Sequence, residues 1–434
     1  MRVVELFCGA GGMSLGLTQA GFKVVGAFDN MQEAVDTYQA NLGDHVHQVD
    51  LTDILDVVPM IRALSPDMIV GGPPCQDYSV AGKRKEEKNA RLTLAFAIAI
   101  VTCRPEWFLM ENVVQAATST TWAEAKDVLK RAGYGISESK VKFEYHDVPQ
   151  ARKRLIVVGR LGERDGFLNS AIAAKANDTS MPLRDGLVTR YGNLKGAFYL
   201  KAPPELTGLL RGGHVYTRPL MSGRAVRSVD EPYATLTRTS GEPPSARFRA
   251  KYQANPRDSA PLEKAAVMDQ KYLSMVQGFP PDWTWVSRSR RQTQVMIANA
   301  VPPPAAKRIG EVIRSRHQGW SAPALEGRFL QWLLRQRRFR DKTAYNIMSN
   351  IRRARALLGG RTFADPALEL ATLEATPDFA ALRPNVRSDL RRGLTLYAEY
   401  LDDQYRRRGI GSLSAQPKIF QKPQPFNFDV MAEL

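Results

Sequence analysis

The chain has 434 residues, which is enough for about two or three domains, each with its own hydrophobic core. It carries 61 lysines and arginines against 44 aspartates and glutamates, and the resulting net charge of +17 favours a polyanionic partner such as nucleic acid. No run approaches the roughly 18 apolar residues of a membrane span, and no signal-peptide pattern is present, so we expect a cytoplasmic protein without a membrane partner. The three cysteines, Cys8, Cys75 and Cys103, predict neither a disulfide framework nor a metal site.

Residues 1 to about 160 alternate short β-branched runs with helical stretches. Strands are predicted at 3–6, 23–28, 45–48, 68–71, 107–111, 136–142 and 155–159. Helices are predicted around 13–20, 31–41, 53–64, 92–103 and 119–132. This alternation indicates βαβ units and an α/β fold with a mainly parallel, doubly wound sheet.

The first predicted strand runs into the turn Phe7-Cys8-Gly9-Ala10-Gly11-Gly12. Glycines between a strand and a helix let a ligand approach the backbone closely, although their spacing here is not the dinucleotide fingerprint. Asp29, at the end of the second strand, could hydrogen-bond ribose hydroxyls. Asp50, after the third strand, could bind adenine or cap the next helix, and Asp53 competes for the capping role. Together these residues indicate an adenosine-containing cofactor.

The fourth strand ends in the stiff turn Gly71-Gly72-Pro73-Pro74-Cys75. A thiol on a rigid turn at the carboxyl end of a strand is where an α/β enzyme would place a nucleophile. A proline-rich loop that happens to contain a small apolar residue explains this stretch equally well when it is taken alone.

Two further segments could face the same crevice. Glu111 follows the fifth strand and is a candidate acid, although a single glutamate is more often a solvated surface residue. Strand alternation places Gln150, Arg152 and Arg154 on one face, where they could hold a planar polar ligand or a phosphate. A solvated basic edge strand is the alternative.

Five segments in a fixed order resemble the motifs of the cytosine-5 DNA methyltransferases. They are Phe7-Cys8-Gly9-Ala10-Gly11-Gly12, Asp29, Pro73-Pro74-Cys75-Gln76, Glu111-Asn112-Val113 and Gln150-Ala151-Arg152-Lys153-Arg154. The segments 233–238 and 273–280 are similar to the motifs that follow the family's target-recognition region, and 294–302 looks like its last motif. The resemblance covers residues 1 to about 317.

The resemblance implies a covalent mechanism on a flipped-out cytosine. Cys75 would be the nucleophile that adds to C6, on a loop fixed by Pro74. Glu111 would hold a proton against N3, while Arg152 and Arg154 would stabilise the charge and the thiolate. Residues 78–91 would form a lid over the DNA. The residues expected to contact DNA are Gln76, Ser79, Arg91, Gln150, Arg218 and Arg224.

The resemblance also implies S-adenosyl-L-methionine as the methyl donor and S-adenosyl-L-homocysteine as the product. The last motif would fold back beside the first to complete the cofactor pocket. The residues expected to bind the cofactor are Phe7, Gly9, Gly11, Gly12, Asp29, Asp50, Asn299 and Val301. The fold expected for this part is the Rossmann-like methyltransferase domain.

Three domains are predicted. Residues 1–160, completed by 265–317, would form the catalytic domain, and 161–264 would hold a small, irregular target-recognition region or a basic loop-rich insertion. Residues 318–434 read as an all-α bundle, since an apolar stripe begins at Phe329 and helical patterns follow at 343–358 and 386–401. This bundle is basic and weakly resembles the core-binding domains of tyrosine integrases, so DNA binding and dimerisation both remain open.

The leading prediction is a sequence-specific methyltransferase acting on double-stranded DNA in a bacterial, nucleoid-associated setting. An RNA cytosine-5 methyltransferase and a catalytically silent DNA-binding regulator are the alternatives. The sequence leaves open a homodimer and a cognate restriction endonuclease as partners.

Overall fold

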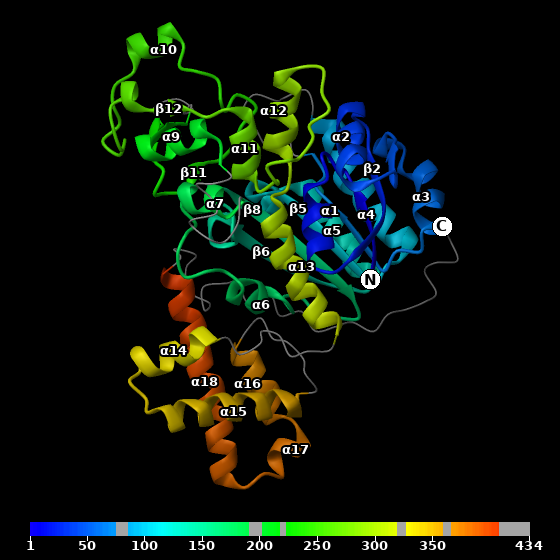
Figure 1. The fold of residues 1–434 in the computed structure, drawn as a ribbon. Helices are drawn as coiled ribbons and strands as arrows, with labels where there is room; N and C mark the ends of the chain where they lie inside the picture. Colours follow the sequence, from blue (N-terminus) through cyan, green and yellow to red (C-terminus); the bar gives the residue numbers. More distant parts are fainter. Residues whose placement is uncertain (75–85, 191–201, 218–222, 319–326, 359–365, 408–434) are drawn as a thin grey trace. The chain divides into compact units, whose positions relative to one another are not determined.

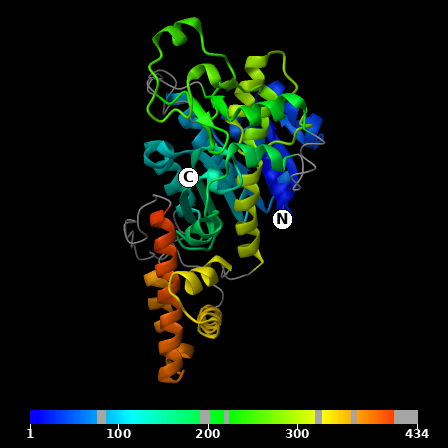
Figure 2. The same ribbon diagram turned by 60° about the vertical axis from the view of Figure 1, so that its left-hand side comes forward.

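The computed structural model describes residues 1–74, 86–190, 202–217, 223–318, 327–358 and 366–407 (Figures 1 and 2). The described residues up to 318 belong to one compact unit, and those at 327–357 and 366–407 belong to a second. No helix in these described ranges is long and apolar enough to cross a membrane.

The first unit is built on a seven-stranded sheet with the order β3-β2-β1-β4-β5-β8-β6. Its strands are β1 (Arg2–Leu6), β2 (Lys23–Asp29), β3 (Val46–Gln48), β4 (Met68–Gly71), β5 (Trp107–Val113), β6 (Tyr134–Lys142) and β8 (Lys153–Leu161). Only β8 runs antiparallel to its neighbours β5 and β6. The predicted mainly parallel, doubly wound sheet is confirmed. The strand order reverses between β1 and β4, which is where ligands bind in open α/β sheets.

Helices cover both faces of this sheet, and for that reason the central strands are continuous apolar runs. One face packs against α3 (Ile54–Ala63), α4 (Glu86–Cys103) and α5 (Thr120–Arg131). The other packs against α1 (Gly12–Gln19), α6 (Asn169–Ala174) and α13 (Pro303–His317). The helix α2 (Gln32–Leu42) packs beside the turn that follows β1. Because α6 belongs to the core of the sheet, this core extends past the boundary at 160 expected from the sequence.

The end of the methyltransferase-like region packs directly against its beginning, and Figure 1 shows α13 beside α1. The close approach depends on a glycine, because a Cβ atom at Gly16 would lie 2.3 Å from the carbonyl oxygen of Pro303 and 2.6 Å from the Ala306 side chain. Residues separated by almost the whole length of the first unit therefore pack together on one face of the sheet.

Short elements fill the rest of the first unit. They are β7 (Gln150–Ala151), α7 (Leu183–Thr189), α9 (Pro204–Gly212), β9 (His214–Tyr216), β10 (Val226–Ser228), β11 (Tyr233–Ala234), α10 (Ala246–Lys251), β12 (Ala266–Val267), α11 (Gln270–Gln277) and α12 (Arg290–Asn299). Two small sheets, β10-β9-β12 and β11-β7, lie among them. An apolar cluster that includes Leu183, Leu206, Val215, Leu273 and Ile297 holds α7, α9, α11 and α12 together.

The second unit is entirely helical in its described residues. Its helices are α14 (Gly327–Arg335), α15 (Asp341–Leu357), α16 (Pro366–Glu374), α17 (Pro377–Ala380) and α18 (Pro384–Arg407). Figures 1 and 2 show α15 crossing α18 steeply. The buried core contains Phe329, Ile351 and Leu394. A buried ion pair between Arg355 and Glu369, 2.9 Å apart, lies beneath the Tyr397 ring.

Candidate active site

Three chain segments meet at the carboxyl ends of the central strands. They are the turn after β1, the turn after β4 and the end of β5. Asn112 joins two of them, because its side-chain amide donates a 3.3 Å hydrogen bond to the carbonyl oxygen of Pro73. A Cβ atom at Gly72 would lie 3.6 Å from a carboxylate oxygen of Glu111, so the β4 turn passes close to that acid.

Glu111 is buried and lies between two arginines. Arg154 Nε is 3.0 Å from Glu111 Oε1, and Arg152 Nη2 is 3.9 Å from the same oxygen. Arg152 is itself only 2% exposed and donates a 2.8 Å hydrogen bond from Nη1 to the carbonyl oxygen of Ala298. The sequence-predicted acid and both arginines are therefore brought together, and α12 helps to hold the group.

Several predicted residues fall outside the described ranges. Pro74 is the last residue described before the gap at 75–85, which contains Cys75, Gln76 and Ser79. Arg218 falls in another gap. Part of the predicted lid lies in the gap at 75–85, but α4 already begins at Glu86, so the end of the segment 78–91 is helical. Arg91 lies in this helix, and its side chain is not among the described ones.

Gln150 does not face a DNA-binding surface, contrary to expectation. It is fully buried, and its amide nitrogen donates a 2.6 Å hydrogen bond to the side chain of Gln277. Its amide oxygen accepts a 3.0 Å hydrogen bond from the backbone nitrogen of Leu236. Gln277 in turn donates to the carbonyl oxygen of Ala300. Gln150 thus ties β7 to the segments that follow the recognition region.

Arg224 is also engaged within the protein and not placed for DNA. Its guanidinium forms a two-pronged pair with the Glu231 carboxylate, with Nη1 and Oε2 2.6 Å apart. Its Nε donates to the carbonyl oxygen of Val226 at 3.0 Å. These contacts stabilise the segment that leads into β10.

The turn after β1 has the shape that a closely bound ligand requires. Gly9 and Gly11 have φ values of 52° and 84°, and a Cβ atom added at Gly9 would meet nothing within 4 Å. The other two glycines are packed: a Cβ at Gly11 would meet Leu42 at 2.5 Å, and one at Gly12 would lie 2.2 Å from the Val301 carbonyl oxygen. Gly9 therefore borders open space, whereas Gly11 and Gly12 are small because other parts of the protein press against them.

Phe7, two residues before Gly9, also lies in the left-handed region, with φ of 57°. An aromatic residue in this conformation is strained, and such strain collects at ligand sites. On the far side of the turn, Val301 is partly buried against α1, while Asn299 is exposed at the end of α12.

Asp29 braces the turn from the side. Its carboxylate accepts hydrogen bonds from the backbone nitrogens of Gly9 at 2.8 Å and Met31 at 2.9 Å. Burial nevertheless raises the pKa of this carboxyl, because the desolvation of the charged form outweighs those hydrogen bonds. Asp29 thus links the end of β2 to the open space beside Gly9.

Asp50 caps the short 3-10 turn at Leu51–Asp53, and this settles which of Asp50 and Asp53 is the capping residue. Its Oδ1 accepts hydrogen bonds from the backbone nitrogen and the hydroxyl of Thr52, at 3.0 and 2.8 Å, where a short 3-10 turn begins. Asp53 makes no capping hydrogen bond with its side chain. The capping reading therefore holds for Asp50, and it remains compatible with contact to a ligand.

The family model for C-5 cytosine-specific DNA methylase matches residues 1–315. The chain belongs to this family. The type II methyltransferase M.HgiDI of Herpetosiphon aurantiacus is 36% identical over 304 residues, which are 70% of this chain and 90% of the relative. M.HindV of Haemophilus influenzae is 34% identical over 317 residues, 72% and 96% of the two chains. The structure of the S. pombe Dnmt2 methyltransferase shares the fold at 18% identity, with a TM-score of 0.50 over 73% of this chain and 97% of that one.

Family membership makes the chain a DNA cytosine-5 methyltransferase that uses S-adenosylmethionine. The cofactor fits the residues present, since Gly9 opens the turn and Asp29 offers a carboxylate beside it. The matched residues end at 315, so the second compact unit lies outside the family's common part.

A buried chain of hydrogen-bonded polar side chains, which sequence reasoning missed, lies beside the turn after β1. The Ser14 hydroxyl donates to Glu5, and Tyr38 donates to Ser14 at 2.9 Å. The Tyr38 hydroxyl also lies 3.1 Å from Nε2 of His45. The available signal was an acid inside an apolar strand, Val3-Val4-Glu5-Leu6. Tyr38 also contacts Gly11, so this chain of hydrogen bonds supports the turn from below.

Glu5 should make folding stability depend on pH. Burial raises its pKa from the ordinary 4.5 to about 8, so the folded chain keeps a proton that the unfolded chain has lost. Its stabilising contribution is complete below about pH 4.5 and falls as pH rises toward 8. We expect the free energy of unfolding of Glu5→Gln to rise relative to that of the wild type by up to about 1.4 kcal/mol per pH unit between pH 4.5 and 8. Urea denaturation of both proteins at several pH values measures it, and parallel profiles would contradict it.

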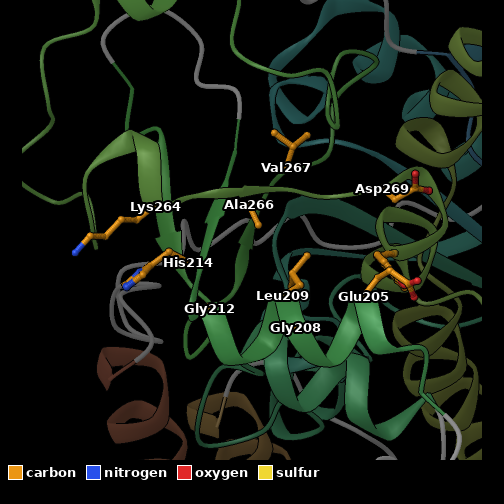
Figure 3. A pocket seen from close by; sticks show the side chains of 10 residues that line it. Glu205, Gly208, Leu209, Gly212, His214, Lys264, Ala266, Val267 and Asp269 are labelled. Atoms are coloured by element: carbon orange, nitrogen blue, oxygen red, sulfur yellow. The ribbon is translucent and has the colours of Figure 1, made fainter.

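A separate pocket of about 340 Å³ lies among α9, β9, β12 and α11 (Figure 3). Glu205 and Asp269 lie at one end, and His214 and Lys264 lie at the other. None of its lining residues belongs to the groups around Glu111 or Gly9.

Proposed function

We propose that the chain is a sequence-specific methyltransferase that modifies a flipped-out cytosine in duplex DNA through a covalent bond from Cys75 to C6. The observation that carries the proposal is that Glu111, Arg154 and the turn that leads to Cys75 lie close together. Asn112 ties Pro73 to the end of β5, and Arg154 lies 3.0 Å from the Glu111 carboxylate. This arrangement supports an acid and a thiol acting on one ring.

The proposed chemistry follows from the weak nucleophilicity of C5 in cytosine. When the Cys75 thiolate bonds to C6, electron density shifts onto C5 and N3. C5 then becomes nucleophilic enough to accept a methyl cation. Glu111 holds a proton at N3, which neutralises the ring charge, and Arg154 and Arg152 fix that carboxyl in place. Water then takes the C5 proton, the electrons of that bond re-form the C5–C6 double bond and expel the thiolate, and N3 returns its proton to Glu111. Pro74 restricts the backbone next to the sulfur.

S-adenosylmethionine supplies the methyl group when it is bound. We propose that the space beside Gly9 receives its methionine part, that Asp29 binds the ribose, and that Asp50 binds the adenine. Phe7, Asn299 and Val301 would close the site around it. The φ value of Gly9 and the hydrogen bonds of Asp29 support this arrangement. Gln76, Ser79, Arg91 and Arg218 remain proposed contacts to DNA.

Asp29→Ala is expected to raise the KM for S-adenosylmethionine by about tenfold or more, since a hydrogen bond to a charged group contributes about 1.5–3 kcal/mol. The substitution would also remove the hydrogen bond that the Asp29 carboxylate accepts from the backbone nitrogen of Gly9, and this would loosen the turn beside the cofactor. Asp53→Ala is the matched control, since this exposed carboxylate caps nothing. Initial rates at varied donor concentration measure both. An unchanged KM in Asp29→Ala would remove the residue from the cofactor site.

The reaction itself is tested with tritium-labelled donor and duplex DNA, followed by identification of the modified base. Label on C5 of cytosine is expected, and label on adenine would overturn the proposal. Competition between duplex DNA and RNA separates it from an RNA methyltransferase. A silent regulator would bind DNA without transferring label at all.

The type II methyltransferases of Herpetosiphon and Haemophilus support proposing a restriction-modification setting for this chain as well. A cognate endonuclease would then cut the same site, and the enzyme would act on the nucleoid in the cytoplasm. Bisulfite sequencing of a host that expresses the chain identifies the site. Scattered methylation without a common sequence would contradict sequence specificity.

A further inference from the structure

The positive charge of the second unit is concentrated in α14, α15 and the loop between them. Residues 327–357 contain one acid, Asp341, and nine basic residues. The basic residues are Arg328, Arg335, Arg337, Arg338, Arg340, Lys342, Arg352, Arg353 and Arg355. Residues 366–407 contain six basic residues and seven acids, so they are close to neutral. The imbalance therefore belongs to one segment and not to the whole bundle.

The acids of α16 and α18 do not offset that charge on α15's exposed side. Five of them are held in ion pairs: Glu369 with Arg355, Glu374 with Arg391, Glu399 with Arg337, Asp402 with Arg406, and Asp403 with Arg407. The three exposed cations of α15 have no acidic partner within 4.0 Å in the described part of the chain. They are Lys342, Arg352 and Arg353.

These cations share one face of the helix with other polar side chains. The exposed positions of α15 are 341, 342, 345, 346, 349, 352, 353 and 356, which recur at helical spacing, while 344, 347, 348, 351, 354 and 355 are buried. From Lys342 to Arg353 this face is about 17 Å long, at about 1.5 Å per residue. Tyr345, Asn346 and Ser349 occupy its middle, and Tyr345 is 58% exposed.

We propose that this face of α15 binds duplex DNA outside the methylated site. Lysine and arginine near the two ends suit phosphates on either side of a groove, and a helix fits the major groove, which is about 12 Å wide. The hydroxyl and amide groups between them can reach base edges or sugars. The proposal needs DNA as the substrate of the enzyme but none of the catalytic roles assigned to Cys75 or Glu111.

A second copy of the chain fits this face less well than DNA does. Two copies of this face, which carries three cations and the single acid Asp341 at its edge, repel each other. Tyr345 is the one large exposed hydrophobic residue among the described residues of the second unit, so an apolar patch of the kind that dimers bury is lacking there.

The test is the salt dependence of DNA binding by the full chain. Each phosphate contact contributes about 0.9 to the slope of log affinity against log salt concentration. In the triple variant Lys342→Gln, Arg352→Gln and Arg353→Gln, we expect the slope to fall by about two to three. Glutamine preserves helix propensity, so the fold should be retained, which circular dichroism and the thermal midpoint check.

A second triple variant, Arg391→Gln, Arg406→Gln and Arg407→Gln, removes the same charge from residues already in ion pairs. It should lower the slope by less than half as much. Fluorescence anisotropy with a labelled duplex of about 40 base pairs, without methyl donor, gives both slopes. An unchanged slope in the α15 variant, or equal slopes in the two variants, would overturn the proposal. So would a wild-type dimer that the α15 variant abolishes with no change in DNA affinity.

Methyl transfer is measured separately at saturating concentrations of a duplex of about 14 base pairs, so that a weaker affinity for DNA does not limit the rate. The α15 variant should retain wild-type kcat on this substrate. If neither the wild type nor the α15 variant transfers methyl groups, the proposed function fails. The salt dependence of DNA affinity still decides whether α15 binds DNA.

Discussion

Cys75→Ala is expected to abolish methyl transfer, with a loss of about four orders of magnitude or more, as removal of a covalent nucleophile does. It should also abolish the covalent complex with duplex DNA that contains 5-fluorocytosine. Fluorine at C5 cannot leave as a proton does, so the wild-type adduct stays trapped after the methyl group is transferred. Denaturing electrophoresis of protein with labelled DNA shows the complex directly.

The other two cysteines provide the controls for this experiment. Cys103 is partly buried, and burial raises the pKa of its thiol. Cys8 is fully enclosed, and burial together with the nearby Asp29 and Glu5 carboxyls raises its thiol pKa far more. Neither thiol is poised to ionise. Cys103→Ala and Cys8→Ala should both still form the complex, and a trapped peptide containing Cys8 would disprove the assignment of Cys75.

The sheet could be predicted because its strands are buried on both faces and therefore carry uninterrupted apolar runs. Met68 to Gly71 is such a run, and its residues are all buried in the structure. The glycine turn after β1 was visible for a similar local reason, because positive φ at Gly9 and Gly11 favours glycine. Features set by one short segment were thus accessible from the sequence.

The hydrogen-bond partners of polar side chains could not be predicted in this way. Gln150 and Arg224 looked like DNA contacts, yet their partners are Gln277, far along the chain, and Glu231. A polar side chain looks the same in a sequence whether it binds a ligand or another part of the fold. The partner of Glu5, Ser14 on α1, was hidden for the same reason.

The family resemblance supplied what the residues alone could not. Taken singly, Glu111 and Cys75 each had a plain structural explanation, and only their order along the chain made the methyltransferase prediction, which the family match confirms. In the second unit, where no such resemblance extends, the helices α16 and α17 were not predicted. The four residues of α17 make only about one turn. In α16 the apolar residues at 367, 368, 370, 371 and 373 are spread around the helix, so they give no clear apolar stripe.

Glu111→Gln is expected to lower kcat by about 10²- to 10⁴-fold, the usual contribution of a positioned acid or base. Glutamine has the same shape and places an amide oxygen where the carboxylate oxygen lies beside Arg154, so the turn and the arginines should remain in place. It cannot give a proton to N3, and negative charge would then build up on the ring as sulfur adds to C6. Single-turnover methylation measures the loss, with donor and DNA affinities measured alongside and expected to stay within about threefold.

Glu106→Gln is the matched control, because the structure repeats the same pairing at the opposite end of the strand pair. Glu106 lies just before β5 and pairs with Arg160 of β8 at 2.7 Å, as Glu111 pairs with Arg154 of β8 at 3.0 Å. Each change removes a carboxylate that pairs with an arginine of β8, although Glu111 also lies 3.9 Å from Arg152 and Glu106 lies 3.4 Å from His317. Only Glu111 adjoins the turn that leads to Cys75. A structural effect would appear in both variants, whereas a catalytic effect appears in Glu111→Gln alone. Slower formation of the 5-fluorocytosine complex in that variant would place the missing proton at the addition step, and an unchanged rate there would exclude Glu111 from it.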